Sequence, residues 1–390
     1  YLQVNLLMGN LVRIIAITVN ELCKRPVIAT ELRQSYNHHI SENPTSRQRD
    51  IACALVASEA ALIDEQCGVQ SFRLRTEFAS LIESLPKLGY IMTLMRNDCA
   101  VHERKGVYQN VHVNGAMGLV VGDDKKIDLR LFLSQWKHGY AVRENLGSGE
   151  RYSLQFFNEA GIAIQKIFLQ KESDLQKYKL LIENYKHEDQ SSRVKFKNTK
   201  IIKKTANDDV VDKKKLFEDW KKMTNVHHFI GVLKRHNVDR QQAFRLVGRK
   251  YAEEFSTKKM DLVLEQIVER KISLMCFVGN QGGIQIHTGV INKVKAMGPW
   301  LNILDREFNL HLLETSIATA WLVRKPTIDG IITSLELYDA EGRQVAQFFG
   351  ERKEGQRENT HWQRLAEGVL QPCAIGHYDH PRIKNETHVA

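Results

Sequence analysis

A diverged internal repeat constrains the fold of this chain more than any other feature of its sequence. The segment YSLQFFNEAG, residues 152–161, aligns with TSLELYDAEG, residues 333–342, at an offset of 181 residues. The same offset aligns IDLRLFL (127–133) with FNLHLLE (308–314). No single match is persuasive, but colinear matches over roughly 75 residues are typical of a repeated structural unit. The sequence therefore predicts a tandem duplication.

Both copies contain alternating apolar and polar segments that follow helical segments. Runs such as YAVREN and YSLQFF in the first copy, and TAWLVRK and TSLELYDA in the second, predict the strands of a meander separated by Gly and Asn-Asp turns. Helices are predicted upstream of the strands, at residues 47–64 and 75–86 in the first copy and at 213–222, 225–236 and 240–254 in the second.

The composition limits the partners and the compartment. The 390 residues suffice for two domains or for one body of two similar halves, and 43% hydrophobic with 26% charged residues is a globular composition. A net charge of +10 favours nucleic acid, an anionic membrane, or a small molecule with carboxylates or phosphates. Without a CxxC pair, the cysteines predict neither a zinc ribbon nor covalent haem attachment, and they suit a reducing cytoplasm. They are Cys23, Cys53, Cys67, Cys99, Cys276 and Cys373.

The first residues form an apolar segment that is too short to span a membrane. Residues 5–19 are interrupted by Asn10 and Arg13, whereas a span needs about 20 apolar residues. No basic segment precedes them, as it would in a secretory signal. Because the sequence starts at Tyr1, Met8 is a candidate start. We interpret residues 1–29 as an N-terminal extension, with membrane contact or targeting as the alternative.

A basic segment joins the two copies. Within the predicted linker, residues 186–212, the stretch 193–204 carries six cations and no acid. Such a run is usually solvated, and the alternative is an arm that binds anions or nucleic acid. Only Phe196 accompanies it, so a platform for stacked bases is poorly supported.

Residues 226–236, VHHFIGVLKRH, place three histidines on one predicted helix that Thr224 or Asn225 can cap. A stripe of Val226, Phe229, Ile230 and Leu233 is expected to face the core. His228 then points to solvent, His236 lies at the helix end, and His227 lies at the boundary between core and solvent.

These histidines do not have the spacing of a multi-histidine metal site. No two stand at i and i+4, which excludes a zinc site of the HExxH kind. Gly231 leaves space beside His227, which suits a single axial ligand to haem, although an ordinary half-exposed histidine is the simpler interpretation. The next predicted helix completes a helix–turn–helix outline, but its apolar residues are more simply a core face.

Several segments resemble the HemS/ChuS haemin-degrading family over roughly residues 30–370, including the repeat. They are AVHERKGVYQNVHVNGAMGLVV (100–121), IDLRLFLSQW (127–136), MTNVHHFIGVLKRHNVDRQQAF (223–244), FVGNQGGIQIHTGV (277–290), WLNILDREFNLHLLE (300–314) and RKPTIDGIITSLELYDAEGRQVAQFFGER (324–352). The resemblance implies an α+β fold, a tandem structural duplication with two large, mostly antiparallel β-sheets that each have accompanying helices. We expect a first repeat at 30–185, a second repeat at 213–370 and a C-terminal tail at 371–390.

The resemblance also implies a site for haem (iron protoporphyrin IX) in a cleft between the halves. His227 matches the proximal iron ligand and Arg130 an arginine on the distal side, and both are candidate catalytic residues. Cofactor-binding residues implied in the same way are Phe132, Arg240, Lys325, Gln347, Phe349 and Arg352, of which Phe349 stands where the family often has tyrosine. Arginine and lysine suit the propionates. Since His311 stands opposite Arg130 in the repeat, we expect one specialised site.

The resemblance implies a cytoplasmic protein of a bacterial haem-uptake system. We expect oxidative degradation of haem to release iron, with Arg130 hydrogen-bonding oxygen or peroxide. The alternative is a carrier or store that delivers haem to a separate haem oxygenase. Besides haem, candidate partners are an inner-membrane haem transporter, that oxygenase and an electron donor, since no GxGxxG loop opens a helix. No nucleic acid and no stable membrane insertion are expected.

Overall fold

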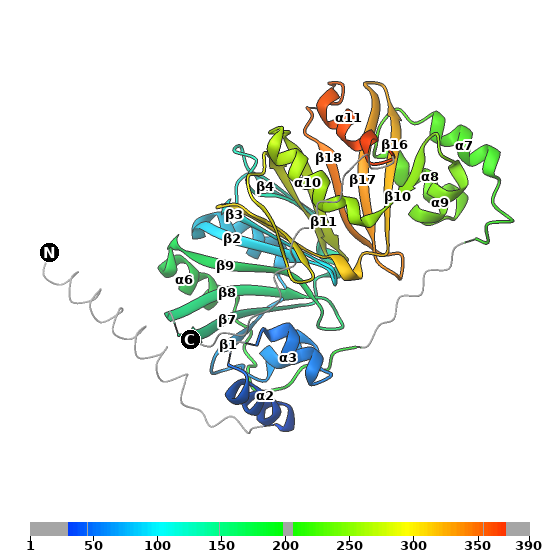
Figure 1. Ribbon diagram of the computed structural model, residues 1–390. Helices are drawn as coiled ribbons and strands as arrows, with labels where there is room; N and C mark the ends of the chain where they lie inside the picture. The colour runs from blue at the N-terminus through cyan, green and yellow to red at the C-terminus, as the bar shows by residue number, and fades with distance from the viewer. Residues whose placement is uncertain (1–29, 45, 148, 198–205, 354, 372–390) are drawn as a thin grey trace, which may run out of the picture. The chain divides into compact units, whose positions relative to one another are not determined.

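The computed structural model describes residues 30–371 except 45, 148, 198–205 and 354 (Figure 1). Its 18 strands form two nine-stranded sheets, in the orders β1-β7-β8-β9-β2-β3-β15-β14-β13 and β10-β16-β17-β18-β11-β12-β6-β5-β4. The α+β class and the two large antiparallel sheets are therefore confirmed. No helix among the described residues is long and apolar enough to cross a bilayer.

The elements of the first copy are as follows. The helices are α2 (Glu31–Glu42), α3 (Gln48–Ala54), α4 (Glu59–Asp64), α5 (Phe78–Ser84) and α6 (Leu175–Tyr185). The strands are β1 (Ser71–Leu74), β2 (Gly89–Arg96), β3 (Ala100–Val107), β4 (Val111–Asn114), β5 (Met117–Val121), β6 (Asp128–Phe132), β7 (His138–Leu146), β8 (Gly149–Phe157) and β9 (Ala163–Ser173).

The elements of the second copy follow in the same order. The helices are α7 (Lys213–Lys221), α8 (His228–His236), α9 (Arg240–Val247), α10 (Met260–Glu269) and α11 (Thr360–Gly368). The strands are β10 (Ala252–Phe255), β11 (Leu274–Asn280), β12 (Gly283–Gly289), β13 (Val294–Met297), β14 (Trp300–Leu304), β15 (Phe308–Leu313), β16 (Thr319–Thr327), β17 (Gly330–Tyr338) and β18 (Gln344–Gly350).

The structure confirms the duplication element by element. β7 and β8 recur as β16 and β17 with the predicted offset of 181 residues, and β1 recurs as β10 with the same offset. Each sheet takes six strands from one copy and three from the other, because β13–β15 continue the first sheet and β4–β6 the second. The sequence pattern did not predict this exchange of a three-stranded meander.

Two predicted helices were wrong in extent, because local backbone geometry interrupts them. The stretch 47–64 forms two helices, α3 and α4, since Val56 has a positive φ of 52° and Ser58 caps a new helix. The stretch 240–254 is helical only to Val247, because Gly248 follows with φ 82°. Beyond this turn the chain continues into β10, which pairs with β16.

Helix α8 begins three residues later than the predicted range 225–236 and buries a different face. The Asn225 side chain accepts a hydrogen bond from the His227 backbone N–H at 2.9 Å, which ends the preceding loop. The buried residues are Phe229, Val232 and Leu233, whereas Ile230 is 45% exposed. The predicted apolar stripe was therefore wrong at Ile230. Val232 lies instead in the buried cluster around Trp220 of α7.

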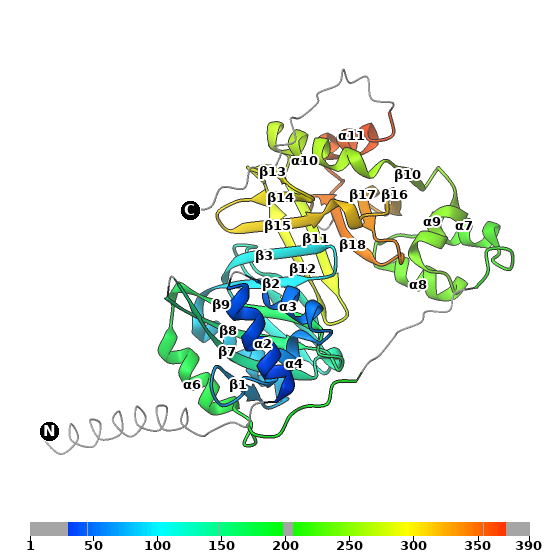
Figure 2. The same ribbon diagram turned by 60° about the horizontal axis from the view of Figure 1, so that its bottom comes forward.

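The chain divides into two compact units, each with its own core. The first contains the described residues of Tyr1–Met95, Lys105–Ile201 and Asn280–Ile284, and the second those of Arg96–Arg104, Ile202–Gly279 and Gln285–Ala390. In the first unit, α5 and α6 cover the apolar face of the strands. In the second unit, α10 and α11 cover one face of the strands. Helices α7–α9 cover part of the other face, beside β10, β16 and β17 (Figure 2).

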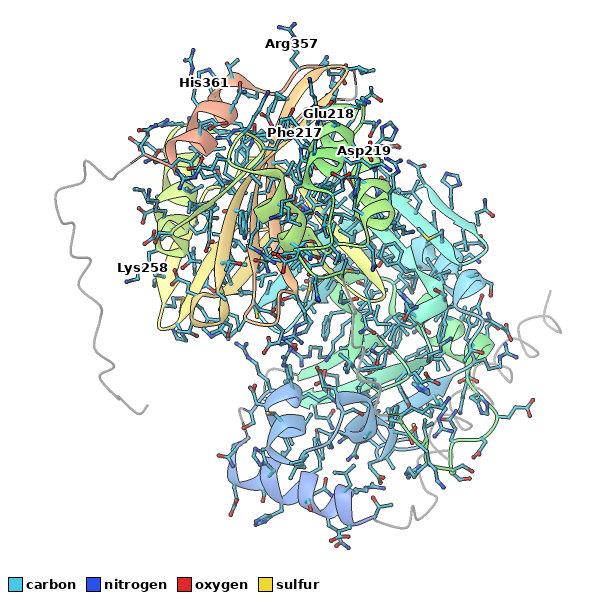
Figure 3. All side chains as sticks on the ribbon, turned by 90° about the vertical axis from the view of Figure 1, so that its right-hand side faces the viewer. Phe217, Glu218, Asp219, Lys258, Arg357 and His361 are labelled. Atoms are coloured by element: carbon cyan, nitrogen blue, oxygen red, sulfur yellow. The ribbon has the colours of Figure 1, made fainter. Side chains whose placement is uncertain are left out.

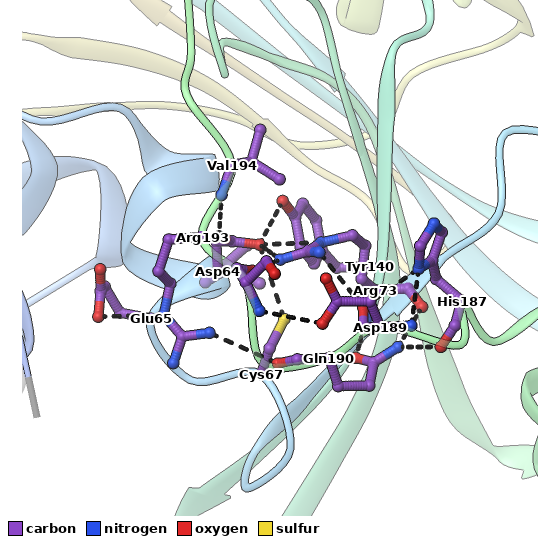
Figure 4. Close-up of polar contacts among 12 residues, drawn as sticks. Asp64, Glu65, Cys67, Arg73, Tyr140, His187, Asp189, Gln190, Arg193 and Val194 are labelled. Carbon is purple, nitrogen blue, oxygen red and sulfur yellow. Dashed lines mark hydrogen bonds and ion pairs between the residues drawn. The ribbon is translucent and has the colours of Figure 1, made fainter. Parts of the chain in front are cut away.

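Residues 187–197 contact the first unit through Arg193 and Val194, although several residues of this part of the predicted linker remain exposed. The buried carboxylate of Asp64 accepts hydrogen bonds from Arg73 (2.7 Å), Tyr140 (3.0 Å) and the backbone N–H of Val194 (2.8 Å), as Figure 4 shows. Arg193 also forms an ion pair with Glu65. Lys200, Lys203 and Lys204 of the basic run lie outside the described residues, as do residues 1–29 and 372–390 with Cys23 and Cys373.

Candidate functional site

The three histidines of VHHFIGVLKRH have different surroundings. His228 is exposed, and its Nδ1 lies 3.4 Å from the hydroxyl of Thr224. His236 ends α8, and its Nε2 lies 2.9 Å from a carboxylate oxygen of Asp219 on α7, which is labelled in Figure 3. The imidazole of the exposed His227 has no hydrogen-bond partner among the described residues. Of the three histidines, it is the one whose ring is available to an external ligand.

His227 lines a pocket within the second unit. The pocket has a volume of about 300 Å³ and is lined by Thr224, Asn225, His227, Met275, Thr327, Ile328, Asp329, Arg352 and Gly355. Arg352 forms a long ion pair with Asp329, at 3.8 Å, and its side chain remains 20% exposed. The pocket therefore combines one available imidazole with apolar side chains and a loosely held cation.

Beside this pocket, one face of the second unit's strands carries aromatic and sulfur-containing side chains. The register pairs Met275 with Phe349 and Phe277 with Gln347, so these four residues face the same side. The rings of Phe277 and Phe349 lie 5.2 Å apart, and both residues are partly exposed. Gln347 is buried. This face of the strands is largely apolar and carries one amide.

A buried ion cluster lies deeper in the same unit. Lys325 is 3% exposed, and its Nζ lies 2.6 Å from Glu336, whose second oxygen accepts from Tyr338 at 2.6 Å. Arg240, at the start of α9, pairs with the same carboxylate at 3.3 Å. Burial raises the pKa of Glu336, but the charges of Lys325 and Arg240 overcome it and hold the pKa at about 2. Burial lowers the pKa of Lys325, and Glu336 opposes that shift.

Because both pair with Glu336, Lys325 and Arg240 have different roles from those expected from the sequence. Two positive charges share one carboxylate, which leaves a net positive charge around Phe229, where both cations contact the ring face. Lys325 is enclosed, whereas the Arg240 side chain is 26% exposed and keeps further N–H donors. Glu336 was missed because a glutamate inside the strand TSLELYDA looks like an outward-facing residue.

The two candidate residues of the first unit lie on β6, on an exposed face. Arg130 pairs in register with Leu119 of β5, and Phe132 pairs with Met117. Met117 and Leu119 are exposed apolar residues that the sequence analysis did not single out, although their alternation along β5 could have indicated them. Asp128 on the same strand forms an ion pair with the Arg130 guanidinium. Burial raises the pKa of Asp128, and the charge of Arg130 opposes that shift.

In the repeat counterpart of β6 the chemistry differs. His311 on β15 lies 2.6 Å from the side-chain oxygen of Asn302 through its Nδ1, so a hydrogen-bonded imidazole replaces the arginine. The two copies therefore present different groups at this position.

The residues of the second unit fit one face of a haem. Among the described residues, no group of three or more His, Cys, Asp and Glu side chains could hold a metal ion by itself. A single imidazole can, however, ligate an iron whose other ligands belong to a porphyrin. Met275, Phe277 and Phe349 offer the apolar contacts that such a ring needs, and Arg240 and Arg352 offer cations for propionates.

Comparison with known proteins gives consistent matches over most of the chain. The model of the haemin-degrading HemS.ChuX domain matches twice, at residues 56–185 and 237–369. The hemin transport protein HmuS of Yersinia pestis is 38% identical over 333 residues, which are 85% of this chain and 95% of HmuS.

Two solved structures are similar over similar lengths. The holo form of PhuS, a heme-binding protein from Pseudomonas aeruginosa, has a TM-score of 0.84 at 40% identity and covers 86% of this chain and 97% of its own. ChuS, an E. coli heme oxygenase, has a TM-score of 0.78 at 35% identity and covers 88% of this chain and 100% of its own.

Proposed function

The chain belongs to the family of haemin-degrading HemS.ChuX domains, and from this we propose that it is a cytoplasmic haem-binding protein of a haem-uptake system that oxidatively degrades haem to release iron. The observation that carries the proposal is the imidazole of His227. It lines a pocket beside an apolar face of the sheet, and it has no partner among the described residues. Solved relatives described as heme-binding and as a heme oxygenase support the ligand and the reaction.

In this proposal His227 would ligate the haem iron, and the apolar side chains would exclude water from the ring. Arg240 and Arg352 bind the propionates, with Lys325 and its buried Glu336 fixing the charge and position of Arg240. Gln347 and Phe349 contact the ring, and because Phe349 has no hydroxyl it contributes packing alone. Haem, when bound, supplies the oxygen chemistry of its own cleavage.

Arg130 and Phe132 are proposed to act on the same ligand. Phe132 would contact the ring, and Arg130 would place a charged N–H donor where a hydrogen bond to the oxidant assists degradation. The carboxylate of Asp128 partly neutralises the Arg130 guanidinium through their ion pair. We expect this pair to restrain the orientation of the Arg130 side chain as well.

A turnover assay with haemin tests the enzymatic role. The protein is loaded with one equivalent of haemin, ascorbate is added in air with catalase present, and the Soret absorbance and released iron are followed. We predict loss of the Soret band with release of iron, and a loss that slows by about one to two orders of magnitude in Arg130→Ala. Arg151→Ala, which removes an exposed arginine paired with Glu144, is the matched control and should react at the wild-type rate.

The second candidate function is that of a non-catalytic haem carrier, which the description of HmuS as a hemin transport protein favours. A Soret band that persists in the same assay, together with transfer of haem to an added haem oxygenase, would replace the enzymatic proposal with the carrier. An inner-membrane haem transporter would then be the upstream partner. In the enzymatic case the further partner is an external electron donor.

A further inference from the structure

A second pocket lies in the second unit and shares no residue with the pocket of His227. It has a volume of about 420 Å³ and is lined by Arg104, His287, Thr288, Gly289, Val290, Asn292, Asp305, Arg306, Glu307 and Phe308. Arg104 and His287 come from β3 and β12, which are counterparts in the repeat. The proposed haem chemistry uses none of these residues.

The buried end of this pocket contains an imidazole whose hydrogen-bonding capacity is not met. His287 is 3% exposed, and neither of its ring nitrogens has a hydrogen-bond partner among the described residues. Its ring is stacked on Phe308, with centroids 3.8 Å apart and planes 3° from parallel, so it is held in one orientation. Buried polar groups are rarely left without partners, which indicates that something else contacts this ring.

The charges of the pocket differ between its two ends. Arg104 is 8% exposed and contributes its positive charge at the buried end. At the open end, the carboxylate of Asp305 accepts three hydrogen bonds from the backbone N–H groups of Asn292 and Lys293, at 3.0–3.1 Å, which hold it against its own loop. Arg306 is exposed at the same end. The lining also contains Glu307, so its two arginines are matched in number by two carboxylates. A negative group that reaches the buried end meets the cation of Arg104 and the imidazole of His287.

The protonation of His287 is consistent with this arrangement. Burial lowers its pKa well below the ordinary value, and the charge of Arg104 lowers it further. The nearby backbone of Gly289 opposes this pKa shift, although its contact with the ring does not have hydrogen-bond geometry. The ring is therefore neutral at neutral pH, with one N–H donor and one acceptor. An anion bound between Arg104 and His287 would raise the pKa of this imidazole.

We propose that this pocket binds a small organic anion, whose carboxylate or phosphate group lies against Arg104 and whose polar atoms hydrogen-bond His287. The volume accommodates a body larger than the anionic group alone. The site is independent of haem binding, so that either can fail without the other.

Histidine-selective NMR of the full chain tests this proposal. The Cε1–H resonance of His287 is assigned by its loss in His287→Phe, a substitution that keeps a planar ring on Phe308. Citrate, inorganic phosphate and, as a neutral probe, glycerol are then titrated separately at low salt. We predict a saturable shift of the His287 resonance with citrate or with phosphate, at about millimolar concentration or below, and none with glycerol. His311, which lies on β15 and contacts Asn302, is the internal control and should not shift.

Two further results decide the outcome. Arg306→Ala changes an exposed residue at the pocket mouth and should weaken the binding of the effective anion about threefold to tenfold without changing the melting temperature. The proposal is overturned if no probe gives a saturable His287 shift. It is equally overturned if a high-resolution structure shows ordered water on both ring nitrogens in the presence of both anions.

Discussion

At the scale of single residues, the buried Glu336 is the counter-charge of two candidate haem-binding cations, Lys325 and Arg240. Replacing it by glutamine leaves Lys325 buried without a counter-charge, which typically destabilises a protein by about 3–5 kcal/mol. We predict a loss of this size for Glu336→Gln in chemical denaturation. Adding Lys325→Met should recover most of the loss. A surface control, Glu341→Gln, should change stability by less than about 0.5 kcal/mol.

Glu358 gives a prediction about pH. Its side chain is buried, and its Oε1 accepts the Thr333 N–H at 2.8 Å while Oε2 has no partner among the described residues. Burial raises its pKa to about 7, with the Thr333 hydrogen bonds and Arg352 opposing the shift and Glu367 adding to it. The folded state therefore retains a proton that the unfolded chain loses, so stability falls as the pH rises from about 4.5 to 7.

Glu358→Gln should remove that dependence. We predict that the variant is more stable than wild type at pH 8, by up to about 3 kcal/mol, and close to wild type at pH 4.5. Urea denaturation at several pH values measures the difference. An equal difference at pH 4.5 and pH 8 would show that Glu358 is not the titrating group.

Residue types and spacing identified part of the candidate site. Spacing placed His227 at the boundary between core and solvent, and the family resemblance assigned it to the iron. The structure leaves its imidazole without a partner among the described residues. Residue types and spacing did not identify Glu336 or Asp128, because a carboxylate that neutralises a cation from another strand has no local sequence pattern. His287 was missed for the same reason, since its burial depends on the packing of Phe308.

At the scale of elements, the segment 187–197 depends on Asp64 at the end of α4. Asp64→Asn weakens the interactions with Arg73 and Tyr140 and disturbs the acceptor of the Val194 N–H. We predict a loss of about 2–4 kcal/mol in stability and faster proteolytic cleavage within this segment. Glu159→Gln, which breaks the exposed pair with Lys197, should leave both almost unchanged. Unaltered proteolysis of Asp64→Asn would contradict the proposed anchor.

Helices were predictable where apolar periodicity and capping residues coincide, as in α7. The end of a helix was not predictable where it depends on one residue with a positive φ, as at Val56 and Gly248. Strand segments with strict alternation, such as β8 and β17, were predicted correctly because both faces of those strands differ in polarity.

At the scale of the whole molecule, the sequence offset of 181 residues predicted the duplication but not the strand order. Colinear matches show that the two copies have the same elements. They do not show whether a three-stranded meander pairs with the edge strand of its own copy or with that of the other copy. The exchange of β4–β6 and β13–β15 between the two sheets is decided by pairing across strand edges, such as that of Phe308 with Arg104.

The proposed function of the whole molecule depends on one assignment, His227 as the residue that binds haem iron. The direct measurement is the absorption and electron paramagnetic resonance of the ferric haem complex for wild type, His227→Ala, and the matched variants His228→Ala and His236→Ala. We predict that only His227→Ala loses the histidine-ligated spectrum of wild type, with an affinity loss of at least about tenfold. A wild-type spectrum in His227→Ala, or its loss in His228→Ala alone, would contradict the assignment.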